Sequence, residues 1–246
     1  MKLTVLGCSG AYPTRYSGTT SYLIESNGYH LLLDSGSGTF RELRNHINPF
    51  ELDACLITHY HYDHIGDLGV LQYYLQLNAN KQNNFQELPI YGHNLDATHF
   101  DNLTFLNITK GIAYHEDEEL DLGPSSITFC KTIHPVPTFA VRIVEKATGK
   151  VLVFTADSGY LEKLIDFARD ADLFLADTYF LNGYEKHHAH LTAGETGYIA
   201  KMAGAKRVVL THLQENTDYE KLIDQTKETF NKDTVSLAKT GKVYEL

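Results

Sequence analysis

Cysteine is scarce in this sequence and forms no pattern. The three cysteines, Cys8, Cys55 and Cys130, are widely separated and odd in number, so no disulfide framework is indicated. We expect reduced thiols and a cytoplasmic protein. Cys55 and Cys130 fall in apolar, strand-like runs that predict buried positions, whereas Cys8 falls in a glycine-flanked loop.

Long apolar runs are absent as well. No stretch is long enough to span a bilayer, and residues 1–7 lead straight into a strand-like run and a glycine, which predicts no signal peptide. We therefore expect no membrane partner. With 43% hydrophobic and 21% charged residues, the composition is that of a soluble globular protein with a sizeable core.

Positive charge is in deficit. The chain carries 21 lysine and arginine residues against 31 aspartate and glutamate residues, for a formal net charge of −10. Such a surface repels nucleic acids as a whole, which disfavours a broad nucleic-acid interface. A small anionic substrate drawn into a metal site remains compatible with this balance.

Histidine, in contrast, is concentrated in one segment after an apolar run at residues 54–57. His59 and His61 point to the same side of an extended segment, because side chains alternate along it. They can chelate one metal ion, while Asp63 and His64, just past the turn, face a second. Buried ionisable groups without partners are costly, so metal binding explains the cluster better than a polar surface loop does.

Apolar periodicity predicts alternating strands and helices along the whole chain. An antiparallel first half and a β/α second half are expected, with no linker between them. One domain over residues 1–246, with a two-layer sheet core and helices on both outer faces, accommodates these elements. The predicted strands cover residues 3–6, 21–25, 29–33, 53–58, 88–91, 127–133, 139–144, 150–155, 172–176 and 207–211, the predicted helices cover residues 39–46, 69–80, 96–105, 161–169, 193–203 and 219–230, and a polar loop covers residues 78–86.

Five of the strand-like runs are followed at once by a histidine or an aspartate. Rigid scaffolds present functional groups at such positions. One occurrence would be weak evidence, but five are hard to assign to packing. The residues are Asp34, His59, His134, Asp157 and His212.

This ordered set resembles the metallo-β-lactamase fold superfamily of dinuclear metal hydrolases, over nearly the whole chain. The family motif His-x-His-x-Asp-His is matched at residues 59–64, and Asp34 matches the family's early structural aspartate. The resemblance implies an α/β fold, the four-layer αββα sandwich of the metallo-β-lactamase type. It also implies two divalent metal ions, one held by His59, His61 and His134 and the other by Asp63, His64 and His212, with Asp157 bridging both.

Imidazole and carboxylate ligands suit zinc, with manganese or iron as alternatives. A water bridging two such cations is deprotonated near neutral pH and can act as the nucleophile. Catalysis is accordingly expected to involve Asp63 and Asp157, together with His190.

The branch of the superfamily is indicated by three positions. The bridging residue Asp157 replaces the cysteine of the best-known lactam hydrolases, and His61 replaces the glutamate of the di-iron flavoprotein branch. The run of residues 190–192, His-Leu-Thr, resembles an element of tRNase Z and related phosphodiesterases whose histidine contacts the scissile phosphate or assists the leaving group. His190 would then be the general acid, with His188 as the alternative.

Two departures from tRNase Z disfavour tRNA as the substrate. Residues 15–18 lack the Arg-Asn signature of its opening loop, and only a dozen residues separate Asp177 from His190, too few for the long tRNA-binding arm. We expect a compact phosphodiesterase acting on a small or cyclic nucleotide, and the resemblance is compatible with a homodimer. The alternatives are a thioester or lactone hydrolase, a tRNA 3′-end endonuclease and a non-catalytic metal-binding protein.

Four further residues have supporting roles in this interpretation. Asp177 ends a strand and is a candidate to orient a histidine. Thr192 and Glu195 form a capping box at the start of a helix. Asp67 is expected to cap or support the helix that follows the histidine motif.

Overall fold

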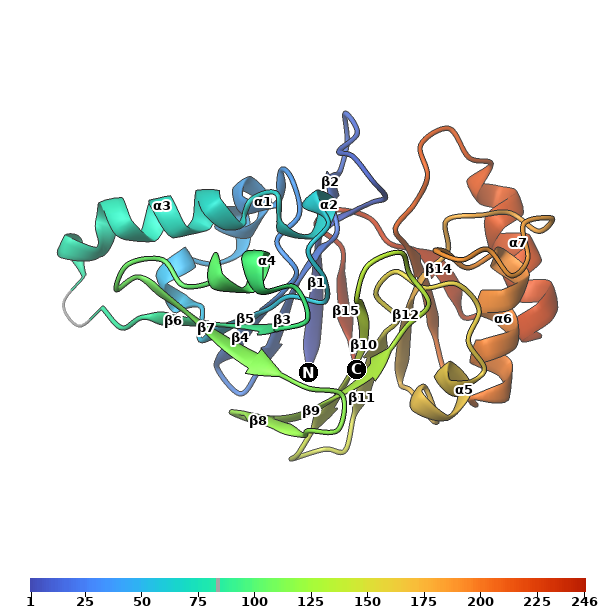
Figure 1. Ribbon diagram of the computed structural model, residues 1–246. Coiled ribbons are helices and arrows are strands. Elements are labelled where there is room, and N and C mark those ends of the chain that lie inside the picture. The colour runs from blue at the N-terminus through green and yellow to red at the C-terminus, as the bar shows by residue number, and fades with distance from the viewer. Residues whose placement is uncertain (83–84) are drawn as a thin grey trace. The chain divides into compact units, whose positions relative to one another are not determined.

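The computed structural model of the chain describes residues 1–82 and 85–246 and contains two compact units (Figure 1). The N-terminal unit comprises residues 2–115 and 239–245, and the C-terminal unit comprises Met1, residues 116–238 and Leu246. Each unit has its own mixed sheet and its own helices. The single domain over residues 1–246 stays a prediction.

The N-terminal unit is built on a sheet with the order β15-β1-β3-β4-β5-β6-β7, in which β2 also pairs with β1. Along this order the pairs from β15 to β4 are antiparallel and the pairs from β4 to β7 are parallel, and β2 runs parallel to β1. The strands are β1 (Lys2–Ser9), β2 (Gly18–Thr19), β3 (Ser21–Ser26), β4 (Tyr29–Leu33), β5 (Ala54–Leu56), β6 (Leu88–His93), β7 (Thr109–Tyr114) and β15 (Val243–Glu245).

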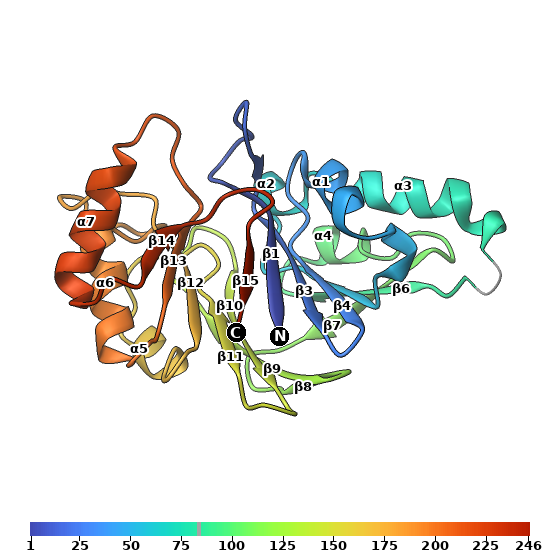
Figure 2. The same ribbon diagram turned by 180° about the vertical axis from the view of Figure 1, so that it is seen from behind.

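Helices of this unit pack on the sheet through one apolar cluster. Leu71 and Leu75 on the buried face of α3 join Leu32 of β4 and Cys55 of β5 in that cluster. Figure 2 shows α1 and α3 along the same side of these strands. The helical segments are α1 (Thr39–His46), η1 (Pro49–Glu51), α2 (Tyr62–Ile65), α3 (Leu68–Asn78), η2 (Ala79–Lys81) and α4 (Ala97–Asp101).

The C-terminal unit repeats this plan with the sheet order β14-β13-β12-β11-β10-β9-β8. Strands β8 to β11 are antiparallel and β11 to β14 parallel. Both ribbon views place its helices together beside the parallel strands. The elements are β8 (Leu120–Leu122), β9 (Ser125–Lys131), β10 (Phe139–Glu145), β11 (Val151–Phe154), α5 (Lys163–Phe167), β12 (Leu173–Asp177), α6 (Ala193–Met202), β13 (Val208–Thr211), α7 (Tyr219–Phe230) and β14 (Val235–Leu237).

Most predicted elements are present, but the antiparallel first half was wrong. Its sheet is mixed, because β4 to β7 run parallel. The strands β2, β7, β8, β14 and β15 were not predicted. Residues 83–84 of the predicted polar loop lie outside the described residues, and a short 3₁₀ helix, η2, opens that loop.

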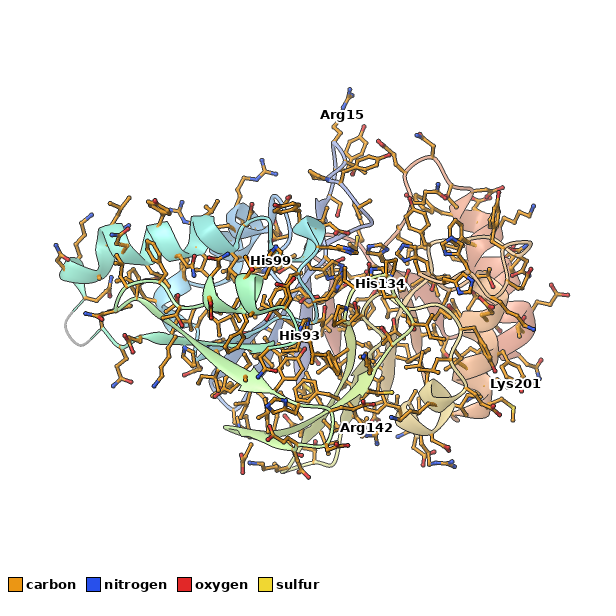
Figure 3. All side chains as sticks on the ribbon, in the orientation of Figure 1. Arg15, His93, His99, His134, Arg142 and Lys201 are labelled. Atoms are coloured by element: carbon orange, nitrogen blue, oxygen red, sulfur yellow. The ribbon has the colours of Figure 1, made fainter. Side chains whose placement is uncertain are left out.

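Two helices are shorter than predicted because the chain finds other partners. Helix α4 ends at Asp101, and the chain then turns so that Phe105 bridges to Thr109. Helix α5 ends at Phe167, where the Arg142 guanidinium (labelled in Figure 3) donates 3.0 Å hydrogen bonds to the carbonyl oxygens of Phe167 and Arg169. A side chain from β10 thus satisfies carbonyl groups at the end of α5.

The cysteines are as expected except for Cys8. All three are free thiols and all are buried, Cys8 included, whose sulfur lies 3.5 Å from the Ser17 hydroxyl. Burial raises the pKa of the Cys8 thiol. Within the described residues, no helix combines the length and the apolar character needed to cross a membrane.

Candidate metal centre

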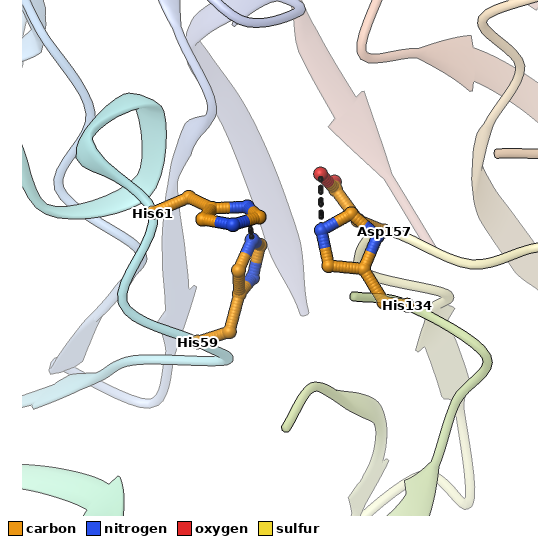
Figure 4. A group of neighbouring side chains, drawn as sticks. All are labelled: His59, His61, His134 and Asp157. Atoms are coloured by element: carbon orange, nitrogen blue, oxygen red, sulfur yellow. Dashed lines mark hydrogen bonds and ion pairs between the residues drawn. The ribbon is translucent and has the colours of Figure 1, made fainter. Parts of the chain in front are cut away.

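The histidine motif of the N-terminal unit occupies the turn between β5 and α2. The chain leaves the buried strand at Leu56, and His61 is the N-cap residue of α2. His59 is buried and its Nε2 lies 3.2 Å from Nδ1 of His61, as the dashed line in Figure 4 marks. The prediction that these two side chains point to the same side is confirmed.

Asp34 fixes this turn from the end of β4. Its carboxylate accepts hydrogen bonds from the amide and the hydroxyl of Thr58, at 2.8 and 2.9 Å, and from Nδ1 of His64 at 2.8 Å. Complete burial raises the pKa of the Asp34 carboxyl, although His64 and Thr58 act in the opposite direction. Asp34 also adopts a left-handed backbone conformation with φ of 57°, which a non-glycine residue keeps only where surrounding contacts enforce it.

Asp63 is held by a contact that the sequence did not reveal. Its Oδ2 accepts a 3.0 Å hydrogen bond from the amide of Ala11, which lies in the glycine-rich loop after β1. The same oxygen lies 3.8 Å from Nε2 of His64. The sequence signal for this contact is the glycine-, serine- and threonine-rich composition of residues 7–20, which predicts a loop that approaches the site.

The C-terminal unit gathers His134, Asp157 and His212. Oδ2 of Asp157 lies 3.7 Å from Nε2 of His134 (Figure 4) and 3.3 Å from Nε2 of His212. The three side chains are 2–3% exposed. His212 and Ala156, the residue before Asp157, both have positive φ, so strained backbone marks this cluster as it marks Asp34.

The hydrogen bonds around two histidines determine which ring nitrogen is available. Nδ1 of His134 contacts the carbonyl oxygen of Ala189 at 3.1 Å, and a carbonyl accepts only, so Nδ1 carries the proton. Nδ1 of His64 likewise faces the Asp34 carboxylate. In both rings Nε2 then keeps its lone pair, which is the arrangement typical of histidines that bind metal.

The donor spacing also fits a metal ion. Two ligand atoms on one tetrahedral zinc ion, each about 2.1 Å from it, lie about 3.4 Å apart. The contacts of Asp157 with His134 and His212, at 3.7 and 3.3 Å, bracket this value. Buried carboxylate and imidazole groups at this spacing form a donor set that suits divalent zinc, iron or manganese.

His190 is the fourth histidine of the C-terminal unit and pairs with Asp177. Its Nδ1 lies 2.8 Å from Oδ2 of Asp177, and its ring lies 4.9 Å from that of His212. Burial disfavours the charged ring, but the Asp177 carboxylate outweighs burial and raises the pKa of His190. Ligand-type atoms of Asp157, Asp177, His190 and His212 all lie within 4.8 Å of one another.

Asp177 has the position predicted for a carboxylate that orients histidines. Besides His190, it contacts Nδ1 of His212 at 3.5 Å and accepts a 3.1 Å hydrogen bond from the amide of Ser158. By contrast, His188, the alternative to His190, is exposed. The structure therefore places His190, rather than His188, in the ligand cluster of this unit.

The two helix starts gave different outcomes. The capping box of Thr192 and Glu195 is confirmed at the start of α6. Asp67 stands at the N-cap position of α3 but makes no side-chain cap there. Its carboxylate instead accepts a 2.9 Å hydrogen bond from the amide of Phe40 and so supports the first turn of α1.

Comparison with known proteins identifies the family. The sequence profile of the Beta-lactamase superfamily domain matches residues 29–213. The chain belongs to this superfamily. The fold class expected from the resemblance, the metallo-β-lactamase type of αββα sandwich, is thereby confirmed.

Individual members of the superfamily are similar over the whole chain. The sequence is 42% identical over 246 residues to "Probable metallo-hydrolase YhfI" of Bacillus subtilis, covering 100% of both chains. The crystal structure of the metallo-beta-lactamase fold protein YhfI aligns with a TM-score of 0.93 over 99% of this chain and 98% of that one.

Ribonuclease Z proteins are also among the relatives. Ribonuclease Z of Protochlamydia amoebophila is 26% identical, covering 92% of this chain and 91% of that protein. The short form of human tRNase Z aligns with a TM-score of 0.77 at 23% identity, over 100% and 99% of the two chains. The predicted likeness to the tRNase Z branch is confirmed at this level, and the structural likeness at 23% identity shows the fold.

Proposed function

We propose that this chain is a dinuclear metal-dependent hydrolase that cleaves phosphodiesters of small or cyclic nucleotides. In this proposal the chain holds two divalent ions, which are zinc by donor type. One ion would be bound by His59, His61 and His134 and the other by Asp63, His64 and His212, and Asp157 would contribute to both.

The orientation of the ligands supports this assignment. Asp34 and the Ala189 carbonyl each accept a hydrogen bond from Nδ1 of a histidine. Nε2 of that histidine is then the atom that can bind a metal ion. Two bound cations would supply activation of water and neutralisation of the charge on the phosphoryl oxygens. The chain's own contribution is to hold the donor atoms in place before the ions bind.

The pairing of His190 with Asp177 is the observation that carries the reaction type. Asp177 accepts a hydrogen bond from Nδ1 of the ring, so Nε2 is the nitrogen that can give a proton to the leaving oxygen. An alkoxide leaving from phosphorus is a poor leaving group that needs this proton, whereas a thiolate leaves without one. A histidine general acid beside Asp157 and His212 therefore favours an oxygen ester over a thioester.

Substrate size is inferred from charge and from one short connection. Only a dozen residues join Asp177 to His190, and the chain carries a net charge of −10, so neither a binding arm nor a basic surface favours tRNA. The relatives named ribonuclease Z support phosphodiester chemistry. The "Probable metallo-hydrolase" name of YhfI supports the metal-dependent hydrolase more generally.

Two further expectations belong to this proposal. The buried free thiols support a cytoplasmic location, where cysteines stay reduced. A homodimer is proposed from the family resemblance alone. Light scattering of the purified chain measures its oligomeric state directly.

The proposal is tested by a metal assay followed by a substrate panel. The purified protein is expected to contain about two zinc ions per chain and to hydrolyse bis-p-nitrophenyl phosphate and cyclic nucleotides. On cyclic nucleotides, whose leaving group is an alkoxide, His190→Ala is expected to lower kcat by roughly 10²–10⁴-fold, as loss of a general acid does, with the metal content retained.

His188→Ala is the matched control, because His188 is exposed two residues away. It should keep nearly full activity. Turnover of a glutathione thioester or an acyl-lactone, with phosphodiesters untouched, would overturn the reaction type. Full activity in His190→Ala would overturn the role of that residue.

A further inference from the structure

Aromatic and imidazole rings continue from His190 along the segment that joins β12 to α6. Tyr179 stacks on His190 with ring centroids 4.8 Å apart and planes 29° apart. Phe180 meets Tyr179 edge-on at 4.9 Å, and Tyr184 stacks on Phe180 at 4.9 Å with planes 20° apart. His187 completes the group: its ring centroid lies 4.8 Å from that of Phe180 and 6.1 Å from that of His190, and its plane is 10° from that of His190. We call the rings of Tyr179, Phe180, Tyr184 and His187 the ring stack.

The members of the ring stack differ in exposure to solvent. Tyr179 and Phe180 are half-buried, whereas His187 is exposed and Tyr184 is 60% exposed. An aromatic side chain with that much solvent contact is not accounted for by core packing. The stack therefore presents π faces to solvent next to the proposed general acid.

Hydrogen bonds hold the segment in place. The Asn182 amide donates to the Gln225 side chain of α7 at 2.9 Å, and the Lys186 amide donates to the Glu195 carboxylate of α6 at 2.7 Å. A Cβ added at Gly159 would meet the carbonyl oxygen of His187 at 2.1 Å, so the segment rests directly on the turn that carries Asp157. Contacts of this kind preorganise a binding surface and lower the entropy cost of using it.

We propose that the ring stack recognises the base of a nucleoside phosphodiester, with Tyr184 as the principal specificity residue. This inference rests on the proposed function and deepens it, because it assigns the substrate class by its base. Every nucleobase has a π face that stacks on an aromatic ring. The continuity of the stack with His190 places such a base on the same side as the leaving oxygen of the phosphodiester. The short connection between β12 and α6, which lacks an arm for tRNA, thereby contacts the base of a small nucleotide.

The test compares a substrate that has a base with one that lacks it. Steady-state kcat/KM is measured for adenosine 3′,5′-cyclic phosphate and for ribose 3′,5′-cyclic phosphate. Tyr184→Ala is expected to lower the ratio of the two values about tenfold, mainly through KM, since one base stack contributes on that order. Tyr184→Phe should preserve the ratio, because the π face is retained.

Tyr73→Ala is the matched control. Tyr73 lies on α3 with the same 60% exposure but outside the ring stack, so its removal should leave the ratio unchanged. An unchanged ratio in Tyr184→Ala, or an equal loss on both substrates, would overturn the inference.

A binding measurement separates this inference from the proposed function. Calorimetric titration with AMP requires no turnover. AMP binding that weakens about tenfold in Tyr184→Ala, in a protein that hydrolyses no phosphodiester, would support base recognition and refute the proposed reaction. Hydrolysis of both cyclic phosphates at equal efficiency by the wild-type protein would refute base recognition and support the reaction.

Discussion

Asp172 is a carboxylate that links neighbouring strands at the ends opposite those that carry the proposed site residues. It precedes β12, and it accepts the amide of Val151 at the start of β11 at 2.9 Å. Its other oxygen accepts hydrogen bonds from the ammonium groups of Lys150, at 3.0 Å, and of Lys206, at 2.9 Å. Lys206 precedes β13. The proposed site residues Asp157 and Asp177 lie at or beyond the other ends of these strands, so Asp172 has a structural role.

Asp172→Asn is expected to make stability depend less on pH. Burial alone would raise the pKa of Asp172, but Lys206, the Val151 amide and Lys150 lower it to about 2. A lowered folded-state pKa contributes stability above the unfolded value near 3.8, and that contribution disappears as pH falls through about 2. Because the lysine partners are exposed, Asp172→Asn should lower the free energy of unfolding at pH 7 by about 1–2 kcal/mol. Urea unfolding at pH 7 and pH 3 measures it.

The control for Asp172 is an exposed carboxylate. Asp166 pairs with Arg169 on the surface, so Asp166→Asn should change the free energy of unfolding by less than about 0.5 kcal/mol. An equal destabilisation by Asp172→Asn at both pH values would show that the carboxylate charge is not the cause.

Single residues were predictable where the chemistry is local. His59 and His61 are two apart, and that spacing alone places their side chains together. The contact between Asp63 and Ala11 spans 52 positions, and no local pattern encodes it. Asp67 shows the same limit, since a typical helix-start residue proved to support a helix that precedes it in the chain.

Among the elements, α6 and α7 show how a glycine can set the distance between two helices. A Cβ on Gly197, in the middle of α6, would lie 2.6 Å from the carbonyl oxygen of Thr226 in α7. Backbone atoms cannot move aside as a flexible side chain does. The helices are therefore close because position 197 has no side chain.

Gly197→Ala is expected to destabilise the protein by roughly 1–3 kcal/mol, the range for overpacking a close contact. Gly69→Ala is the control, because a Cβ on Gly69 in α3 would meet no atom within 4 Å. It should be neutral or stabilise by up to about 1 kcal/mol, since alanine favours helix. Thermal and urea unfolding of both variants measure the difference. A Gly197→Ala variant as stable as the wild type would show that the helices separate at little cost.

Elements were predictable in proportion to their local signals. Helices α1 and α7 and strand β4 have the predicted bounds, because each combines a clear periodicity with clear ends. Strands β7 and β15 were missed because their pairing partners, not their own patterns, define them: Thr109–Tyr114 is largely unpatterned, and Val243–Glu245 is three residues long.

At the scale of the whole molecule, both units follow one plan of antiparallel strands followed by parallel ones. Periodicity alone did not reveal this, since it indicated a purely antiparallel first half. The fold class was predictable from the family resemblance, which rests on the order of ligand-type residues along the chain. Roles for those residues stay predictions, because a role depends on bound groups as well as on position.

Metal removal is expected to destabilise the whole protein. A ligand present at about 100 times its Kd stabilises the folded state by about 2.7 kcal/mol, which corresponds to roughly 5–11 °C in Tm for a chain of this size. Dialysis against a chelator should lower Tm by this amount, and added zinc should restore it. Calorimetry with parallel metal analysis tests this. Unchanged Tm after complete loss of metal would argue that the ligand clusters are stable without ions.

The pairing of β15 with β1 has a consequence for biosynthesis. Lys2, Leu3 and Thr4 of β1 pair with residues 243–245 of β15, so the partner of this strand edge is synthesised 239 to 243 positions later in the chain. At roughly 5–20 residues per second, the uncovered strand edge waits on the order of 10–50 s. An open edge is a template for pairing with other chains, so the nascent chain should depend on chaperones most during this interval.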